Sequence, residues 1–471
     1  MRKALAAALA LLVLLSSLQA GSYTLDDLIA SMLVNNTDIR SAESAVTESH
    51  LDLKDAYAEM QPEITLDLMA MYMPDPVIGD ITVNTNDLLT QMGYSPASVG
   101  YDLTLYDGMP QTYYAASVSL EQPVITWGKL AYNAKMRKAI EDARKLQRTD
   151  TEKQLTAELK ARLAALYYIA QADGLLESII ETSAELVDLS ERSGESGMLI
   201  RTAVMDARLS AKEAELSRME LEAQKASVLE GLREMTGLYE IEAEDIDFTP
   251  DEEEYGAILS LGLESLIGMA TDPGTLSMRM VEKQKTAAKY AKKITDRSLY
   301  LIPDLGLRLS ASYGGSSLPF IETGWSGDDD WNLMVTVALS TTIWDGGKKL
   351  NDRNRAKSAI VDAEITKDDV TNMLRQAVTD AYNSASLSLA RAEYDRLRIE
   401  NAEYKLSDAQ RGYETGAMSR IDVLSAELEL CQEELKLVTE SITLAQNCYT
   451  LSYLADLGSA KAAVISDGKA E

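Results

Sequence analysis

The sequence predicts a mainly α-helical protein with a smaller β component, built from two tandem helix–strand–strand–helix repeats. Two long stretches, 129–193 and 348–411, contain no proline and only one glycine between them, which is typical of very long helices. Each stretch follows segments in which apolar and polar residues alternate, as in strands with one apolar face. The stretches open with similar sequences, "KLAYNAKMRKAIEDA" and "KLNDRNRAKSAIVDA", so the arrangement occurs twice.

The first twenty residues have the pattern of a secretory signal peptide. Arg2 and Lys3 give a positive start, the run Ala4–Leu15 is apolar, and the small residue Ala20 precedes the expected cleavage point. We therefore expect residues 1–20 to direct export and to be removed from the mature protein.

Composition argues against several classes of protein. The formal net charge of −30 disfavours binding to nucleic acid, and it disfavours a polybasic membrane-surface role. After the leader, no segment has the run of roughly 18 apolar residues that marks a transmembrane helix. An exported chain can instead cross a membrane as a closed β-barrel, because a barrel satisfies its own backbone hydrogen bonds.

The repeat continues through most of the chain. The stretch "VITWGK" (124–129) recurs as "TTIWDGGK" (341–348), and "ESGMLIRTAVMDARL" (195–209) recurs as "ETGAMSRIDVLSAEL" (414–428). We divide the mature chain into a first repeat, a connector, a second repeat and a tail, at 21–235, 236–270, 271–458 and 459–471.

Strands and helices occupy corresponding positions in the two repeats. Pro62 and Pro303 each open a strand, a position where proline is well tolerated. The predicted strands are 62–71, 114–125, 303–313 and 332–343. The long helices at 129–193 and 348–411 end near Gly197 and Gly416, and return helices follow at 198–235 and 417–456.

The last helix carries a regular apolar stripe. Its members are spaced alternately by four and three residues, which is a heptad seam and predicts helices that supercoil side by side. They are Leu424, Leu428, Cys431, Leu435, Val438, Ile442, Ala445 and Tyr449.

Four strands are too few to close a barrel, because a small barrel needs about eight. The barrel must therefore be shared between chains, and three chains would supply twelve strands. Aromatic residues near the strand ends fit the girdles of a membrane barrel: Tyr113, Tyr114, Trp127, Tyr313, Trp331 and Trp344. Among them, we expect Trp127 and Trp344 to mark the membrane-interface junctions, where glycine supplies the bend between strand and helix.

Residues that carry chemistry are scarce. Cys431 and Cys448 lie 17 residues apart in one predicted helix, about 25 Å at 1.5 Å per residue, so they cannot pair within the chain. His50 is the only histidine and lies in a helical stretch. The acidic run at 242–255 lacks the spacing of an EF-hand loop and predicts a solvated connector. We predict no catalytic, cofactor-binding or metal site, and hence no enzyme.

These features together resemble the TolC family of outer-membrane efflux proteins. The most telling stretches are the two Trp–Gly–Lys junctions and "YETGAMSRIDVLSAELEL" (413–430), which is similar to the family's tip signature. The resemblance implies a homotrimer with a twelve-stranded outer-membrane β-barrel, continuous with a twelve-helix periplasmic α-barrel. It implies a passive exit duct of a tripartite efflux or type I secretion system. The implied partners are a periplasmic adaptor, an inner-membrane transporter of the RND, ABC or MFS type, and outer-membrane lipid, with no cofactor and no nucleic acid.

The resemblance also implies a constriction at the periplasmic helix tip. Asp422 matches an acidic position of the family motif, whereas the next acidic position is Ser425 here. In the first repeat the pattern is reversed, with Ala203 and Asp206 at the equivalent positions. Each chain would still present two carboxylates to one zone of the pore, where they would attract cations.

A latch at the same tip is implied by Tyr413, which matches a family aromatic. A family arginine after the tip glycine is Met418 here, and Arg420 with its repeat equivalent Arg201 could replace it. We therefore expect Tyr413, Arg201, Arg420 and the two aspartates to form inter-helix links that hold the tip shut.

Two other classes remain open from the sequence. A plain diffusion porin would not need the long helices, and a periplasmic coiled-coil adaptor or structural rod would not need the membrane-type strands. The transported substrate cannot be deduced from the sequence.

Overall fold

A computed structural model describes residues 22–75, 78–96, 99–106, 108, 110–196, 201–300, 302–323, 325 and 330–457. The predicted signal peptide 1–20, the tail 459–471 and the first tip glycine, Gly197, lie outside the described residues. The chain forms two compact units, and each sequence repeat contributes to both. One, the helical unit, comprises 1–49, 139–286 and 361–471, and the other, the sheet unit, comprises 50–138 and 287–360.

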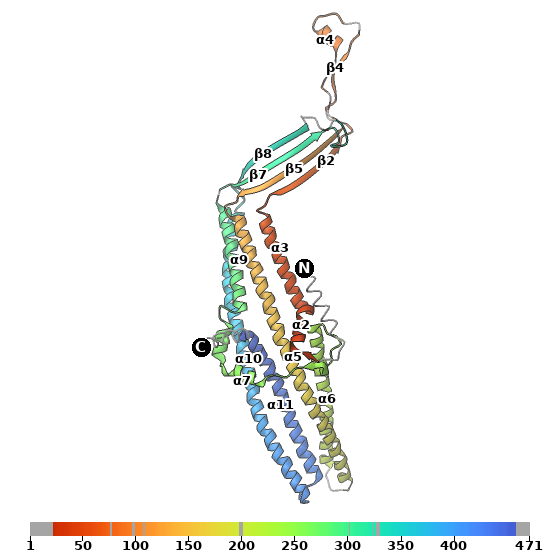
Figure 1. The fold of residues 1–471 in the computed structure, drawn as a ribbon, viewed down its shortest axis with the longest axis vertical. Helices are drawn as coiled ribbons and strands as arrows, with labels where there is room; N and C mark the ends of the chain where they lie inside the picture. Colours follow the sequence, from red (N-terminus) through yellow and green to blue (C-terminus); the bar gives the residue numbers. More distant parts are fainter. Residues whose placement is uncertain are drawn as a thin grey trace. The chain divides into compact units, whose positions relative to one another are not determined.

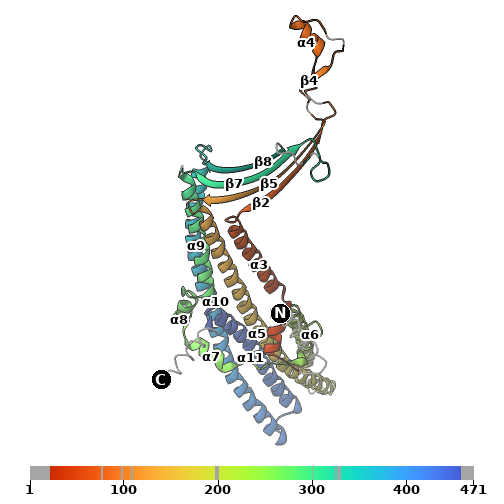
Figure 2. The same cartoon turned by 45° about the horizontal axis from the view of Figure 1, so that its top comes forward.

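The sheet unit contains one curved layer of four antiparallel strands in the order β2–β5–β7–β8 (Figures 1 and 2). They are β2 (Glu63–Tyr72), β5 (Thr112–Ile125), β7 (Asp304–Gly315) and β8 (Trp331–Ser340). Consecutive strands of each repeat are neighbours, and β5 pairs with β7 to join the repeats. The last strand ends at Ser340, three residues before the end that the alternating pattern predicts.

The strand register places most apolar side chains on one face of this sheet and most polar side chains on the other. One row across all four strands is Leu66, Val118, Ala311 and Leu333, and the neighbouring rows on that face are equally apolar. On the β8 part of this face, Leu333 is 78% exposed and Leu339 is 68% exposed. A sheet of a water-soluble protein buries its apolar face, so this face needs an apolar environment outside the chain.

The opposite face of the sheet is polar. Thr65 and Ser119 share a hydrogen bond of 2.7 Å between their hydroxyls, and Arg308 Nε lies 3.3 Å from Glu121 Oε1. These pairs join neighbouring strands, since Ser119 and Glu121 lie on β5, between β2 and β7. The sheet thus has one apolar face and one face whose polar side chains pair with one another across the strands.

The connection between β2 and β5 contains structure of its own. It holds β3 (Ile81–Asn84), α4 (Thr85–Gln91) and β4 (Asp102–Tyr106), with β3 and β4 paired antiparallel. Asn84 caps the helix by accepting a hydrogen bond from the backbone N–H of Asn86. Both strands alternate apolar and polar residues, but they are only four and five residues long, too short for periodicity to identify them.

Helices make up most of the remaining chain (Figure 1). The two longest, α5 (Lys129–Glu195) and α10 (Lys348–Glu414), have 67 residues each and extend slightly beyond their predicted ends. The return helices are α6 (Arg201–Thr236) and α11 (Arg420–Leu454). The others are α2 (Leu25–Asn35), α3 (Thr37–Ala58), α7 (Glu252–Ser260), α8 (Leu263–Ala270) and α9 (Leu276–Leu299). A short parallel pair, β1 (Tyr23–Thr24) with β6 (Ile246–Asp247), and the turn η1 (Ala243–Asp245) complete the order.

The predicted heptad stripe of α11 forms part of the core of the helical unit. Leu424 and Ala445 are fully buried, and Cys431 and Leu435 are partly buried. Towards the helix C-terminus the stripe packs on α5, α7, α8 and α10, and towards its N-terminus it packs on α5 and α6. Cys448 is also buried, and burial raises the pKa of its thiol to about 12, so it behaves as an inert core residue.

Among the described residues, one helix is long and apolar enough to cross a membrane by composition alone. This is α5, which contains an 18-residue window of mean hydropathy 1.2, but half of that window is buried inside the chain. The apolar character of α5 is therefore explained by its contacts with the core of the helical unit.

The connector is more ordered than its acidic sequence predicts. Asp251 caps α7 through its side chain, and Tyr255 on α7 is only 2% exposed. The Tyr255 hydroxyl donates a hydrogen bond of 3.3 Å to the hydroxyl of Tyr449 on α11, and their rings lie edge to face at 5.6 Å. The acidic run therefore does not form a fully solvated linker, because one of its residues anchors it to the core.

We expect Tyr255→Ala to detach α7, because a large buried ring is lost, at a cost of about 3 kcal/mol. Hydrogen exchange of residues 251–260 should become much faster, and thermal unfolding should occur at a lower temperature. Tyr255→Phe removes only the hydroxyl and should have a small effect, and Tyr239→Ala, at a 71% exposed tyrosine, should have none. Unchanged exchange in Tyr255→Ala would show that the anchor is elsewhere.

Candidate functional site

The turn between α10 and α11 forms the second of the two predicted tips. The backbone N–H of Gly416 donates to the carbonyl of Tyr413 at 3.0 Å, and that of Ala417 donates to the carbonyl of Gly412 at 2.8 Å. These two bonds form a Schellman motif, which satisfies the last carbonyls of a helix. Gly416 has φ of 73°, so the turn requires the left-handed conformation that glycine adopts without strain.

The helix that returns from this tip begins with a capping box. Asp422 Oδ2 accepts hydrogen bonds of 2.7 Å from both the backbone N–H and the hydroxyl of Ser419, and Ser419 Oγ accepts from the Asp422 N–H. The two bonds to its carboxylate hold the pKa of Asp422 below its usual range. The side chain predicted as a pore carboxylate is thus ionised at neutral pH and also fixes the start of α11.

Met418, at the position where the resemblance implies an arginine, has a packing role. A Cβ atom placed on Gly412 would lie 2.8 Å from the Met418 Cγ and 2.9 Å from its sulfur. The methionine side chain therefore closes over Gly412, and a larger residue at this position would displace it. This contact makes the turn compact, without a cation at this position.

Arg420 makes the inter-helix link of this tip. Its Nε and Nη2 atoms each lie 3.1 Å from a carboxylate oxygen of Glu185 on α5. This two-pronged pair ties the second repeat to the first, and its hydrogen bonds raise the pKa of the arginine. The sequence did not identify Glu185, because the pair joins helices of different repeats and no residue spacing along the chain signals it.

The other predicted latch residues are not brought together within one chain. Arg201 and Asp206 on α6 are exposed, and no hydrogen bond or ion pair joins either to another described side chain. Tyr413 is 51% exposed. Beyond the first tip, α6 is instead tied to α5 by Arg208, whose Nη2 lies 2.6 Å from Glu191 Oε1. Of the predicted latch, only Arg420 makes an inter-helix pair within the described chain.

Two buried acids lie further along the α10–α11 pair, and the sequence did not identify either. Glu433, 4% exposed, accepts hydrogen bonds from Arg398 at 2.6 Å and from Lys436 at 3.0 Å. Asp395 is 7% exposed, and its burial, together with the nearby Glu433 carboxylate, raises its pKa. Arg398 and Lys436 both pair with Glu433, so these two cations balance the buried negative charge between α10 and α11.

At the two strand–helix junctions, different residues adopt the same left-handed backbone conformation. Trp127 and Gly128 have φ of 55° and 82°, and Gly346 and Gly347 have φ of 70° and 87°. Each junction therefore has two consecutive residues in the left-handed region, and Trp127 occupies the place that Gly346 takes in the second copy. The Trp127 indole N–H donates a hydrogen bond of 2.9 Å to the Pro303 carbonyl, and this bond stabilises the unusual backbone conformation of Trp127.

The second junction is held by a different side chain. Trp344 is 81% exposed, while Asp345 accepts hydrogen bonds from the backbone N–H groups of Gly347 and Lys349 at the start of α10. In the first junction, the Lys129 ammonium is instead paired with the carboxylate of Asp304 on β7. Both helices thus start at a fixed angle to their strand, although the anchoring residues differ.

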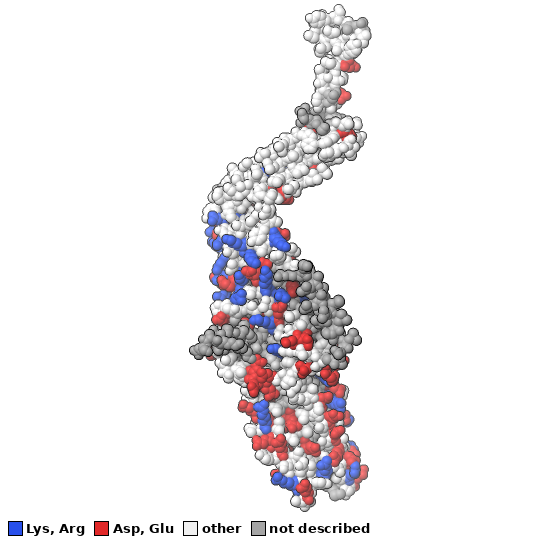
Figure 3. Space-filling view, viewed as in Figure 1, with Lys and Arg blue, Asp and Glu red and all other residues white. Residues whose placement is uncertain are grey.

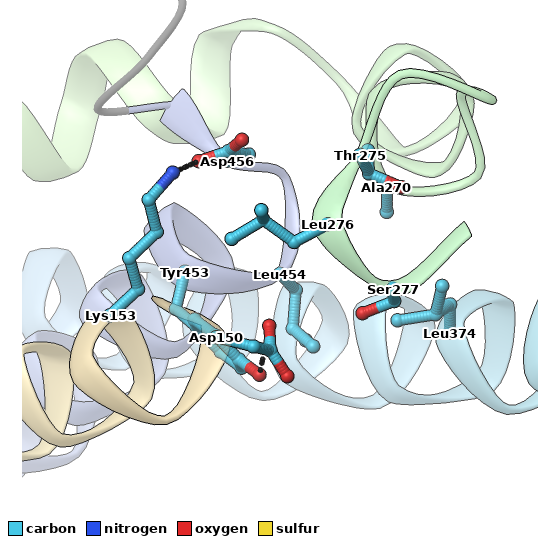
Figure 4. A pocket seen from close by; sticks show the side chains of 10 residues that line it. All are labelled: Asp150, Lys153, Ala270, Thr275, Leu276, Ser277, Leu374, Tyr453, Leu454 and Asp456. Atoms are coloured by element: carbon cyan, nitrogen blue, oxygen red, sulfur yellow. Dashed lines mark hydrogen bonds and ion pairs between the residues drawn. The ribbon is translucent and has the colours of Figure 1, made fainter. Parts of the chain in front are cut away.

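Polar side chains meet in a small crevice of the helical unit (Figure 4). The Tyr453 hydroxyl donates to Asp150 Oδ1 at 3.3 Å, and Lys153 Nζ lies 2.6 Å from Asp456 Oδ1. Burial raises the pKa of Asp150. These pairs fasten the end of α11 to α5, and each carboxylate already has its partner. Among the described residues, no cluster of three or more histidine, cysteine or acidic side chains could hold a metal ion.

We expect the second tip to loosen at acid pH, because the cap depends on an ionised Asp422. A group whose folded-state pKa is lowered stabilises the fold above its ordinary pKa, near 4, and loses that effect as the pH falls further. Protection of residues 412–424 from hydrogen exchange should therefore fall between pH 6 and pH 3.

Removal of the cap should remove most of this pH dependence. Asp422→Asn and Ser419→Ala should each lower protection at pH 6 by about fivefold, the effect of roughly 1 kcal/mol for a lost cap. Asp206→Asn, at an exposed acid with no capping role, is the matched control and should change nothing at this tip. Equal protection in Asp422→Asn and the unchanged protein would disprove the cap.

Part of the chain is similar in sequence to a known outer-membrane protein. The outer membrane efflux protein BepC of Brucella suis biovar 1 (strain 1330) is 26% identical over 183 residues, which is 39% of this chain and 38% of BepC. The aligned part thus spans well under half of that relative.

Solved channel structures share the fold over nearly the whole chain. The outer membrane protein VceC of Vibrio cholerae matches with a TM-score of 0.68 at 16% identity, over 92% of this chain and 95% of VceC. The CmeC outer membrane channel of Campylobacter jejuni matches with a TM-score of 0.68 at 12% identity, over 92% and 85% of the two chains. The MtrE outer membrane channel of Neisseria gonorrhoeae has a TM-score of 0.67 at 13% identity, over 92% and 88%.

A family model described as "Outer membrane efflux protein" matches residues 28–238 and 275–455. The interruption falls on the connector with α7 and α8, and the two matched ranges cover most of the two repeats. The match excludes the two other classes of protein that the sequence left open, which are a plain diffusion porin and a periplasmic coiled-coil adaptor or structural rod. The chain therefore belongs to the outer membrane efflux protein family and is an outer-membrane protein of efflux, not an enzyme.

Proposed function

We propose that three copies of this chain assemble into a passive exit duct, with a shared twelve-stranded barrel in the outer membrane and a shared wall of twelve helices below it. The observation that carries the proposal is the four-stranded sheet with one exposed apolar face and two open edges. In this role the protein conducts substrates from a periplasmic adaptor and an inner-membrane transporter to the cell exterior.

The open edges support assembly between chains. Within the described chain, β2 pairs only with β5 and β8 pairs only with β7, so both outer strands have unpaired backbone groups along about ten residues. Such edges cannot remain open in lipid, where no water satisfies them. Because the sheet has an even number of alternating strands, β8 of one copy meets β2 of the next in antiparallel orientation. The closed ring then has no edge.

The helices support the same arrangement. In the helical unit, α5 and α11 pack against each other, with α6 beside α5 and α10 beside α11. The outer members each expose an apolar stripe. On α6 it comprises Leu209, Leu216 and Met219, and on α10 it comprises Tyr394, Leu397 and Tyr404.

The two stripes match each other in position. Leu216 lies 19 residues after Gly197, and Leu397 lies 19 residues before Gly416. Leu209 and Tyr404 are each 12 residues from their tip glycine, and Met219 and Tyr394 are each 22 residues from it. If the tips of neighbouring copies lie at one level, the α6 stripe of one copy faces the α10 stripe of the next. The stripes then cover each other and complete the helical wall.

We place the gate at the helix tips, where Asp206 and Asp422 would contribute six carboxylates in a trimer. Both acids are exposed within one chain. A ring of this kind would attract cations and slow the passage of anions. The Arg420–Glu185 pair would hold the closed tip, with Tyr413 and Arg201 free to contact a neighbouring copy, and adaptor binding would release it.

The helical interface can be tested by disulfide formation. In a background of Cys431→Ala and Cys448→Ala, the pair Leu216→Cys and Leu397→Cys should cross-link into trimers in membranes on mild oxidation, because the two positions face each other between copies. Each single variant should give none. Arg218→Cys with Leu397→Cys is the matched control, since Arg218 lies on the other side of α6 from Leu216. Trimer cross-linking in the control but not in the test pair would disprove this interface.

The acidic gate can be tested by single-channel recording in planar bilayers. Asp206→Ala/Asp422→Ala should weaken block by divalent cations by about tenfold and change the conductance. Ser419→Ala is the control, because it removes the cap and keeps the Asp422 charge. Unchanged conductance and unchanged cation block in the double variant would exclude the carboxylate ring. The same loss of block in Ser419→Ala would assign the effect to the cap.

A further inference from the structure

Basic residues gather on the helix ends next to the sheet, in a protein whose net charge is −30. Three segments of the sheet unit form this region: residues 129–138 of α5, 287–299 of α9 and 348–360 of α10. Their acidic residues are Asp296 and Asp352, beside a large excess of lysine and arginine. We call the exposed basic side chains of these segments the basic collar. They are Lys135, Lys138, Lys289, Lys293, Arg297, Lys348, Arg355 and Lys357.

The two acids within these segments are already engaged. Asp296 accepts hydrogen bonds of 2.7 Å from Lys292 and from Arg353, and Asp352 lies 2.9 Å from Arg355. Several members of the collar have no carboxylate partner among the described residues: Lys135, Lys293, Arg297, Lys348 and Lys357. Within the part of the chain that the structure describes, these five members therefore keep a positive charge that no carboxylate neutralises.

Part of the collar is preorganised by tyrosine rings. Lys293 Nζ lies 5.5 Å from the ring centre of Tyr132 and 5.0 Å from that of Tyr290, and these two rings are stacked at 6.2 Å. Lys135 Nζ lies 5.9 Å from the same Tyr132 ring. Two ammonium groups are thus held around one pair of rings, without an acid between them.

The collar adjoins the apolar face of the sheet. In Figure 3 the visible face of the sheet is almost free of charge, and it is therefore the apolar face, because the other carries Glu63, Asp67, Glu121 and Arg308. In the same view, Lys and Arg gather over the helices directly beside the strand ends (Figure 3). The boundary also holds exposed aromatic rings: Trp127, Tyr300 and Trp344. Apolar surface, aromatic residues and cations thus follow one another, in the order of a bilayer core, its interface and its headgroups.

We propose that the basic collar binds the phosphate groups of anionic phospholipids in the leaflet next to the helices. The proposal rests on the bilayer placement of the sheet given above. The juxtaposition with the apolar face favours lipid over a soluble anion, because a lipid that covers this face brings its headgroup to the collar. Clusters of four to eight Lys and Arg residues beside a membrane segment attract anionic lipid in this way. The collar would fix the depth of the channel in the membrane.

The test compares lipids retained by the full-length protein. The protein is reconstituted in bilayers of phosphatidylglycerol and phosphatidylethanolamine, extracted with mild detergent, and analysed for the ratio of the two lipids that remain bound. We expect severalfold enrichment of phosphatidylglycerol, which falls as salt is raised. The collar variant Lys135→Gln/Lys293→Gln/Arg297→Gln/Lys348→Gln should lose this enrichment.

The matched control removes the same number of cations outside the collar: Lys212→Gln/Arg218→Gln/Arg375→Gln/Lys405→Gln. It should retain the enrichment. If the collar variant does not insert, the pair Lys135→Gln/Lys348→Gln replaces it and should reduce the enrichment by about half. Enrichment that persists in the inserted collar variant would overturn the proposal, as would equal loss in the control.

Two further measurements distinguish a failure of this lipid-binding proposal from a failure of the proposed exit duct. Trimer formation and single-channel conductance should be normal in the collar variant, since the collar lies outside the conducting path. A wild-type protein that forms no trimer or no channel would contradict the exit duct and leave the lipid ratio as an independent result. Collar-dependent binding to isolated cell-wall glycan, with no preference among lipids, would contradict the lipid assignment.

Discussion

The central constraint on this molecule is that the edges of its sheet need partners. Four strands segregate their side chains into an apolar and a polar face, but the backbone groups of β2 and β8 remain unpaired on the outer sides. In a bilayer each unpaired backbone N–H or C=O group would cost several kcal/mol of free energy, so the sheet of a single chain would be unstable there. The edges of the sheet are therefore incomplete within one chain, and the exposed apolar stripes on α6 and α10 likewise lie uncovered in the described chain.

The backbone at both ends of the long helices has a fixed geometry. Each long helix leaves its strand through two consecutive left-handed residues, so strand and helix meet at a definite angle. At the far end of α10, a Schellman motif and a capping box follow each other within a few residues and reverse the chain tightly. The Arg420–Glu185 pair then ties the two repeats together near the tip. An exposed ion pair contributes only about 0–1 kcal/mol, so this link is weak enough to break when a partner binds.

Much of this fold can be predicted from the sequence, because it depends on periodicity and repetition. Alternation over Leu305, Leu307 and Leu309 predicts a strand, and the 4–3 spacing on α11 predicts its buried seam. What the sequence does not show depends on single contacts between distant segments. Tyr255 lies in a run of acids and gives no sign of its contact with Tyr449, and Glu185 gives no sign of its pairing with Arg420. The role of Met418 follows only from its contact with Gly412, which a residue-by-residue match to a family motif cannot reveal.

The most direct test of this account is a cysteine scan along the two open edges, with positions 63–72 of β2 combined with positions 331–340 of β8 in membranes. The account predicts disulfides between chains, in one antiparallel register, that link three copies into a ladder ending at the trimer. Failure of every β2–β8 pair to cross-link between chains, or pairs that link in a parallel register, would contradict the shared barrel.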